Sequence, residues 1–333
     1  MGIGVSLLIL NFFLGHFFLE NYQLNLSERI VANLKTLVWY LTLFVYISSF
    51  TLLPREFIKK NINHFIKNLD FIVYLQILTV VIGLFTDIYL FQSYGKSRFG
   101  YSGIFINVMQ GNYLYILLII IYFYKLLLDN SVKNRFNLLL LLIFSSLIGT
   151  KGILLFNTIF LNYLAFQYLK KESLLKYFYP FLFILIIGFI GGIIFIINSP
   201  ILQKIYKEEG FLNLMTSMRY SLVTDSFFPF INNYWTNYNY LFGGAMFNLN
   251  RTEFEVIDFL WFFGIVGSVI YFTLINKYLV KIKYLFTNIP FISLGFIILL
   301  TGSFFSSITT TLLFVFLILF LLENNLLPHN EYS

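Results

Sequence analysis

The sequence contains no cysteine, so it can form no disulfide bond, no thiolate nucleophile and no cysteine-ligated metal site. Histidine is almost as scarce, since only His16, His64 and His329 occur. None of these three lies in a segment that we expect to face outward, which argues against a metal centre or a histidine-based active site on that face. We therefore expect no cofactor.

Charged residues are the second shortage. They make up only 11% of the chain, whereas 59% of the residues are hydrophobic, 21% are aromatic and the mean hydropathy is +0.82. Soluble domains carry about 25% charged residues. The composition therefore predicts an all-α, polytopic integral membrane protein, with residues 1–333 forming a single membrane domain.

Apolar segments of the length that a membrane helix needs recur along the chain. They predict about ten transmembrane helices, at residues 3–19, 36–53, 71–90, 104–124, 137–149, 152–169, 178–197, 256–275, 288–302 and 305–322. Alternate short loops between them are basic and carry Arg55, Lys59, Lys60, Lys67, Lys125, Lys133, Arg135, Lys170, Lys171, Lys176, Lys277, Lys281 and Lys283. Because basic loops stay in the cytoplasm, both termini are predicted to be cytoplasmic. The net charge of +7 then reflects topology and not nucleic-acid binding.

One charge interrupts the apolar stretch of 33 residues at 137–169: Lys151, between Gly149 and Gly152. A straight helix of that length would measure about 50 Å, against about 30 Å for the hydrocarbon core of a bilayer. We therefore predict a hairpin that turns at Lys151 on the outer side. A charge at membrane depth is costly unless it is paired or lines a wet cavity, so Lys151 is a candidate functional residue.

The long hydrophilic segment 198–255 is predicted to be a large extracytoplasmic loop. It faces the same side as the loop 91–103, the Lys151 turn and a polar break at 301–307. Its many aromatic residues suit either stacking on sugar rings or an interfacial belt. Within it, Met215, Arg219 and Leu222 recur at helical spacing, which favours an amphipathic helix.

The charged residues of these outward segments are the candidate site residues. Four cations suit the binding of a pyrophosphate: Arg98, Lys151, Arg219 and Arg251. They suit the anchoring of lipid head groups as well. Three acids lie where the large loop enters the span at 256–275: Glu253, Glu255 and Asp258. These acids either cap the helix or supply a general base that deprotonates an attacking hydroxyl group.

Several short motifs occur in a fixed order between about residues 95 and 310. They are Arg98-Phe99-Gly100-Tyr101-Ser102-Gly103 followed by Asn107, then Gly149-Thr150-Lys151-Gly152, then Arg219, then Leu241-Phe242-Gly243-Gly244, then Glu253 to Asp258 leading into Phe263-Gly264-Ile265-Val266-Gly267, and finally Thr301-Gly302-Ser303. This order resembles that of the Wzy-like oligosaccharide repeat-unit polymerases, which make bacterial O-antigen and capsule.

The resemblance implies a GT-C-like helical glycosyltransferase of the bacterial inner membrane. Such enzymes move a growing glycan from undecaprenyl pyrophosphate onto an incoming lipid-linked repeat unit, and they need neither a nucleotide sugar nor a metal. The four cations would bind the pyrophosphate and the acids would serve the acceptor. The implied partners are undecaprenyl-pyrophosphate-linked oligosaccharides and the lipid bilayer, with a chain-length regulator and a flippase as further partners.

Three alternatives compete with this interpretation. An O-antigen ligase shares the architecture but uses a histidine in its large loop, and residues 198–255 contain none. A flippase or other transporter would carry ionisable residues along its spans, where this chain has little beyond Lys151 and Asp87. A structural or sensory membrane protein is the remaining alternative.

Overall fold

Helices form almost all of the regular structure of the protein. The computed structural model describes residues 1–20, 24–86, 88–93, 100–105, 108–171, 200–245, 251–281, 283, 289–300, 302, 304–305, 307–324 and 326. Among these residues no strand forms, and Gln92 and Tyr101 make only an isolated bridge. The prediction of an all-α fold is confirmed.

The helices follow one another along the whole described chain. They are α1 (Gly2–Phe17), α2 (Leu26–Thr51), α3 (Arg55–Thr86), the short 3-10 helix η1 (Tyr89–Phe91), α4 (Val108–Leu128), α5 (Val132–Ser146), α6 (Lys151–Lys171), α8 (Pro200–Thr216), α9 (Arg219–Ser221), the π-helical η3 (Leu222–Phe227), α10 (Phe228–Tyr234), α11 (Asn237–Phe242), α13 (Glu255–Tyr278), α15 (Ile289–Leu300) and α16 (Ile308–Glu323).

Four of the described helices contain a segment that is long and apolar enough to cross a membrane. These segments are Leu26–Thr51, Glu56–Thr86, Val108–Leu128 and Glu255–Tyr278, and Gly2–Phe17 and Ile308–Glu323 are shorter apolar helices. The structure thus supports a membrane protein, although it does not confirm all ten predicted spans. The span predicted at 178–197 lies outside the described residues.

Two helices start well before the predicted spans. α2 begins at Leu26 instead of residue 36, because Asn25 and Glu28 form a reciprocal capping box at its amino end. α3 begins at Arg55 instead of residue 71, so the predicted loop 54–70 is helical. Residues 55–70 contain lysine and glutamate, which are good helix formers. A span predicted from hydropathy covers only the apolar part of a helix, so the polar first part of α3 was not predicted.

Both predicted helix breaks are confirmed. α5 ends at Ser146 and α6 begins at Lys151, and Gly149 between them has φ of +76°, a conformation that glycine adopts without steric cost. The second break separates α15 from α16. There the Ser307 side chain accepts a hydrogen bond from the backbone N–H of Thr310 and caps α16.

Gly264 kinks α13, with φ of +65° and ψ of −174° inside the helix. The kink packs directly against Gly243, where a Cβ atom would collide with the backbone of Phe262 and Gly264. The Asn11 side chain of α1 donates hydrogen bonds to the carbonyl oxygens of Phe242 (3.0 Å) and Phe263 (2.6 Å). Glycine at positions 243 and 264 therefore allows the two backbones to pack closely.

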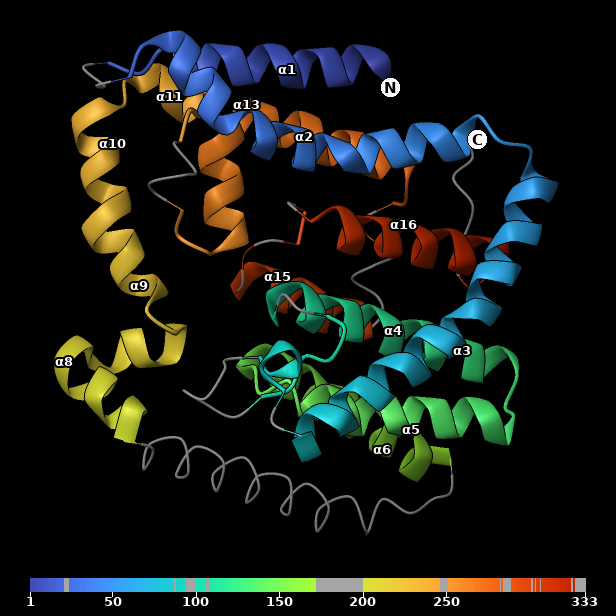
Figure 1. Cartoon of the computed structure of the whole chain (residues 1–333). Coiled ribbons are helices and arrows are strands. Elements are labelled where there is room, and N and C mark those ends of the chain that lie inside the picture. Colours follow the sequence, from blue (N-terminus) through green and yellow to red (C-terminus); the bar gives the residue numbers. More distant parts are fainter. Residues whose placement is uncertain are drawn as a thin grey trace.

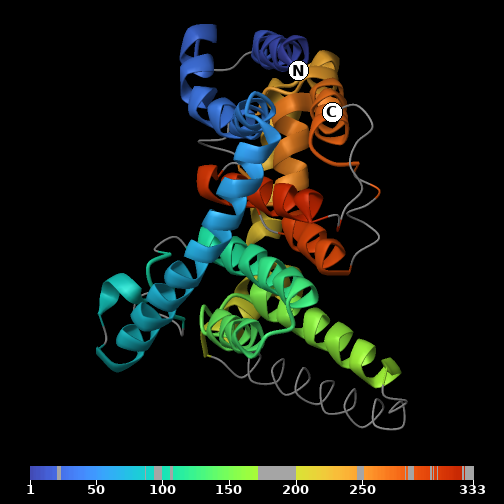
Figure 2. The same cartoon turned by 90° about the vertical axis from the view of Figure 1, so that its right-hand side faces the viewer.

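The helices form two groups that meet at α15 and α16 (Figure 2). In the first group α1 contacts α2, α11 and α13, and α11 also contacts α13, whereas the second group contains α4, α5 and α6, which contact one another. α16 contacts both α2 and α4, and α15 contacts both α13 and α6. The long helix α3 runs diagonally from the first group to the second.

The segment α8 to α10 runs across one end of both groups, on the left of Figure 1, away from the amino terminus. The Lys151 turn lies at this same end, because Lys151 contacts Leu214 of α8. The break before α16 lies there as well, because Gly302 packs against the backbone of Glu253, just before α13. Tyr101 also lies there, since its N–H donates to the carbonyl of Leu147 at 2.8 Å. The outward segments that the sequence predicted therefore do share one end of the molecule.

The predicted loop 198–255 is mostly helical in its described part. Its predicted amphipathic helix through Met215, Arg219 and Leu222 is wrong, because Ser217 and Met218 have φ of +57° and +69° and end α8 before Arg219. Such left-handed residues cannot continue a right-handed helix.

Candidate functional site

Lys151 reaches out of its own hairpin to the large segment that crosses the helix ends. Its Nζ donates a hydrogen bond to the carbonyl oxygen of Leu214, in the last turn of α8, at 2.6 Å. Carbonyl groups in the last turn of a helix lack intrahelical partners and carry partial negative charge, so they suit a cation. The contact brings Lys151 close to the chain that leads to Arg219.

Arg219 follows that turn directly and forms an ion pair with Glu253. Its Nε lies 3.5 Å from Oε2 of Glu253, and its Nη1 donates to the carbonyl of Thr216 at 3.2 Å. The Arg219 side chain is 11% exposed, whereas the Glu253 side chain is 42% exposed. A predicted cation and a predicted carboxylate thus meet at a position that solvent reaches from the side of Glu253.

The backbone on both sides of this ion pair is strained. Among the described residues, only Ser217, Met218 and Glu253 are non-glycine residues with positive φ, and Glu253 has φ of +59°. A left-handed conformation costs a non-glycine residue about 1–2 kcal/mol. The π-helical turn η3 begins just after Arg219, and π-helical turns often occur at functional sites. Backbone strain of this kind clusters at active sites and ligand clamps, which marks the pair as a candidate site.

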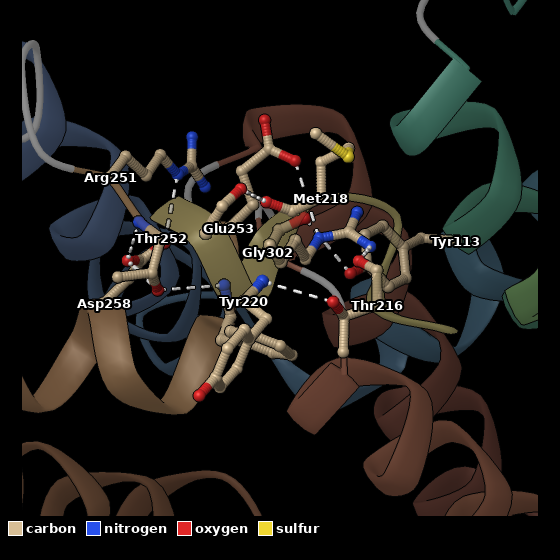
Figure 3. A network of polar contacts seen from close by, with 12 residues as sticks. Tyr113, Thr216, Met218, Tyr220, Arg251, Thr252, Glu253, Asp258 and Gly302 are labelled. Carbon is tan, nitrogen blue, oxygen red and sulfur yellow. Dashed lines mark hydrogen bonds and ion pairs between the residues drawn. The ribbon is translucent and has the colours of Figure 1, made fainter. Parts of the chain in front are cut away.

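Arg251 and Asp258 form a second ion pair at the start of α13 (Figure 3). Nε of Arg251 lies 3.3 Å from Oδ2 of Asp258. Oδ1 of the same carboxylate accepts hydrogen bonds from the backbone N–H of Thr252 at 2.8 Å and from its hydroxyl at 2.7 Å. The Asp258 side chain is 2% exposed. Its oxygens are committed to folding the chain onto α13, which favours the capping interpretation for this acid.

Burial by itself would lower the pKa of Arg251. The neighbouring Tyr40, Asp258 and Glu255 act in the opposite direction and more than compensate, so the pKa of Arg251 is raised above its ordinary value. The guanidinium is therefore charged at every physiological pH. Arg251 serves as the counter-ion of buried acids in this structure.

Glu255 is the most enclosed of the three acids. It is 1% exposed in the first turn of α13. A buried carboxylate surrounded by helices is less accessible to an acceptor sugar than the half-exposed Glu253.

The structure thus gathers six of the seven predicted site residues at one end of the helices. Arg98 lies outside the described residues. The sequence analysis did not single out Thr252, Asn112 and Tyr113. Their side chains make hydrogen bonds to Asp258, to Thr150 and to the carbonyl of Gly302, respectively. A polar asparagine within the apolar sequence of α4 was the available signal for Asn112, whereas nothing in the sequence distinguishes Tyr113 from the many other tyrosines.

Comparison with protein-family models, with curated protein sequences and with solved structures finds no significant match to this chain. The arrangement of these residues is therefore what indicates a function. A cluster of at least three histidine, aspartate or glutamate side chains that would hold a metal ion does not occur among the described residues. The arrangement offers cations for an anionic group and one accessible carboxylate for proton transfer.

Proposed function

We propose that this protein is a membrane glycosyltransferase of the repeat-unit polymerase type. It would transfer a growing glycan from undecaprenyl pyrophosphate onto a lipid-linked repeat unit, at the outer face of the bacterial inner membrane, with both termini in the cytoplasm. The product would be O-antigen or capsule. The observation that supports the proposal is the ion pair of Arg219 and Glu253, which lies beside the last turn of α8 that Lys151 contacts.

The two cations have a defined role in this reaction. The bond between the anomeric carbon and the pyrophosphate oxygen breaks, and negative charge develops on the leaving pyrophosphate. Lys151 and Arg219 would stabilise that charge, as preorganised cations do in phosphoryl and acyl transfer. The anomeric carbon gains oxocarbenium character, as it does in glycoside hydrolysis.

Glu253 would take the proton of the acceptor hydroxyl as the new bond from that oxygen to the anomeric carbon forms. In the present arrangement its carboxylate faces Arg219 at 3.5 Å. A bound pyrophosphate would compete for the guanidinium and leave Glu253 available as a base. Lys151 donates a hydrogen bond to the carbonyl of Leu214, and Arg219 donates one to the carbonyl of Thr216. Phosphate oxygens of the substrate would replace these two carbonyls as acceptors.

A strain that lacks this gene tests the function directly. We expect the ladder of its surface polysaccharide, resolved on a gel, to collapse to the core carrying a single repeat unit. Polymer that accumulates on the lipid carrier would identify a ligase instead, and single units trapped inside the cell would identify a flippase. An unchanged ladder, in a strain that carries no second polymerase, would contradict a role in polymerisation.

The cation assignment predicts a loss of chain extension in the variants Lys151→Ala and Arg219→Ala. Removing one preorganised donor to a developing negative charge typically lowers the rate by about 10²–10³-fold. The measurement is the chain length of surface polysaccharide at equal protein abundance. Lys204→Ala is the matched control, because Lys204 lies on α8 with its side chain 72% exposed and pairs only loosely with Glu208, at 3.9 Å. Normal chain length in both site variants would refute the assignment.

A further inference from the structure

Two adjacent residues near the start of α4, Asn112 and Tyr113, lie between the two helix breaks of the site. Asn112 is 4% exposed and Tyr113 is fully buried. Each side chain makes a polar contact with a different break, and neither contact belongs to the helix ladder of α4. The two residues therefore connect segments that are far apart in the sequence.

Asn112 holds the turn that precedes Lys151. Its Oδ1 accepts a hydrogen bond from the hydroxyl of Thr150 at 3.0 Å, and the same hydroxyl oxygen accepts from the N–H of Ile153 at 3.4 Å. Gly152 allows this close approach, since a Cβ atom there would lie 2.9 Å from Nδ2 of Asn112. The side chain of Asn112 thus fixes the amino end of α6, where Lys151 is the first residue.

Tyr113 holds the other break, on which Glu253 rests (Figure 3). Its hydroxyl donates to the carbonyl oxygen of Gly302 at 3.2 Å, and its ring packs edge-on against Phe304, with centroids 5.2 Å apart. A Cβ atom on Gly302 would lie 3.1 Å from Cα, C and O of Glu253. The backbone of Gly302 therefore supports Glu253 in its left-handed conformation.

We propose that Asn112 and Tyr113 are positioning residues, which set the separation between the cation Lys151 and the base Glu253. The inference rests on the proposed function. Adjacent residues of one α-helix differ by only about 1.5 Å in height, so two contacts made from neighbouring positions fix the two breaks relative to each other. Glycosyl transfer requires that the leaving group and the acceptor hydroxyl be held at defined positions relative to the anomeric carbon. A displacement of about 1 Å of one of these groups can lower the rate by about 100-fold.

The experiment uses the full-length protein in lipid bilayers, with purified lipid-linked repeat units as the substrate. Tyr113→Phe removes one hydroxyl oxygen and keeps the ring against Phe304, while Gly302→Ala places a methyl group against the backbone of Glu253. Gly295→Ala in α15 is the matched control, because a Cβ atom there meets no atom within 4 Å. Asn112→Leu removes the acceptor for Thr150, and Asn112→Asp keeps it.

We expect kcat to fall by about 10–100-fold in Tyr113→Phe, Gly302→Ala and Asn112→Leu, with KM nearly unchanged. Asn112→Asp should retain more activity than Asn112→Leu, and Gly295→Ala should match the wild type. A purely structural role would instead reduce the amount of folded protein and leave kcat per folded molecule unchanged.

Two outcomes distinguish a failure of the positioning role from a failure of the proposed function. If the wild-type protein extends glycans and Tyr113→Phe and Asn112→Leu do so at the rate of Gly295→Ala, the inference is overturned and the function stands. If the wild-type protein extends no glycan, the proposed function fails and the inference fails with it. Because Tyr113→Phe is a minimal change, the test does not depend on whether Gly302→Ala folds.

Discussion

Replacing Glu253 by glutamine is expected to abolish most glycan extension while the protein accumulates normally. Glutamine has the same shape and keeps a side-chain oxygen beside Arg219, but it cannot take a proton from an acceptor hydroxyl. General base catalysis contributes about 10²–10⁴-fold to a rate, and we expect a loss in that range. The Glu253 side chain is 42% exposed and outside the helix core, so the fold should tolerate the change.

The measurement is the rate of extension per mole of folded protein, together with the polysaccharide ladder of a deletion strain that carries the variant. Glu208→Gln is the matched control, because Glu208 is an exposed acid of α8 at the same end of the molecule. A normal rate in Glu253→Gln would remove this residue from the reaction. If Glu255→Gln then lost extension at normal abundance, the buried acid would be the base.

The features that the sequence predicted well are those that depend on local chemistry. Gly149 and Lys151 cannot continue a long apolar helix through a bilayer, so a break there follows from the residues themselves. The spans predicted at 3–19, 104–124, 152–169, 256–275, 288–302 and 305–322 agree with the described helices to within a few residues, whereas α2 and α3 begin well before their predicted spans.

The features that the sequence did not predict depend on contacts between distant segments. Arg219 pairs with Glu253 only because Ser217 and Met218 end α8 and redirect the chain, and nothing in these two side chains signals a positive φ. Their strain must be stabilised by the surrounding contacts, among them the hydrogen bond from the N–H of Met218 to the carbonyl of Asn213 at 2.9 Å. Such a turn becomes visible only when the tertiary structure is known.

The charges themselves illustrate the same limit. The sequence offered the cations as candidate ligands of a pyrophosphate and the acids as candidates for a base, but it did not show which cation pairs with which acid. The structure separates one enclosed acid, Asp258, which is 2% exposed and pairs with Arg251, from one accessible acid, Glu253, which is 42% exposed and pairs with Arg219. Mutation of Glu253 should therefore lower the rate of glycan extension, whereas mutation of Asp258 should lower the stability of the protein.

Asp258→Ala is expected to destabilise the protein by about 3 kcal/mol, so that it accumulates poorly and unfolds at a lower temperature. The substitution removes the acceptor for the N–H and hydroxyl of Thr252 and leaves the charge of Arg251 without this counter-ion. We expect a value at the lower end for a broken buried ion pair, because the Arg251 side chain is 25% exposed and water screens part of its charge. The measurement is the thermal unfolding midpoint of the detergent-solubilised protein.

Asp258→Asn is the informative partner of this variant. The asparagine keeps an oxygen that can accept from Thr252 and loses only the charge, so it should recover a large part of the lost stability. If Asp258 has a structural role, both variants extend glycans at a rate set by the amount of folded protein. A variant that stays folded as well as the wild type and yet extends no glycan would place Asp258 in the chemistry, and would shift the reacting centre from Glu253 toward the enclosed pair at the start of α13.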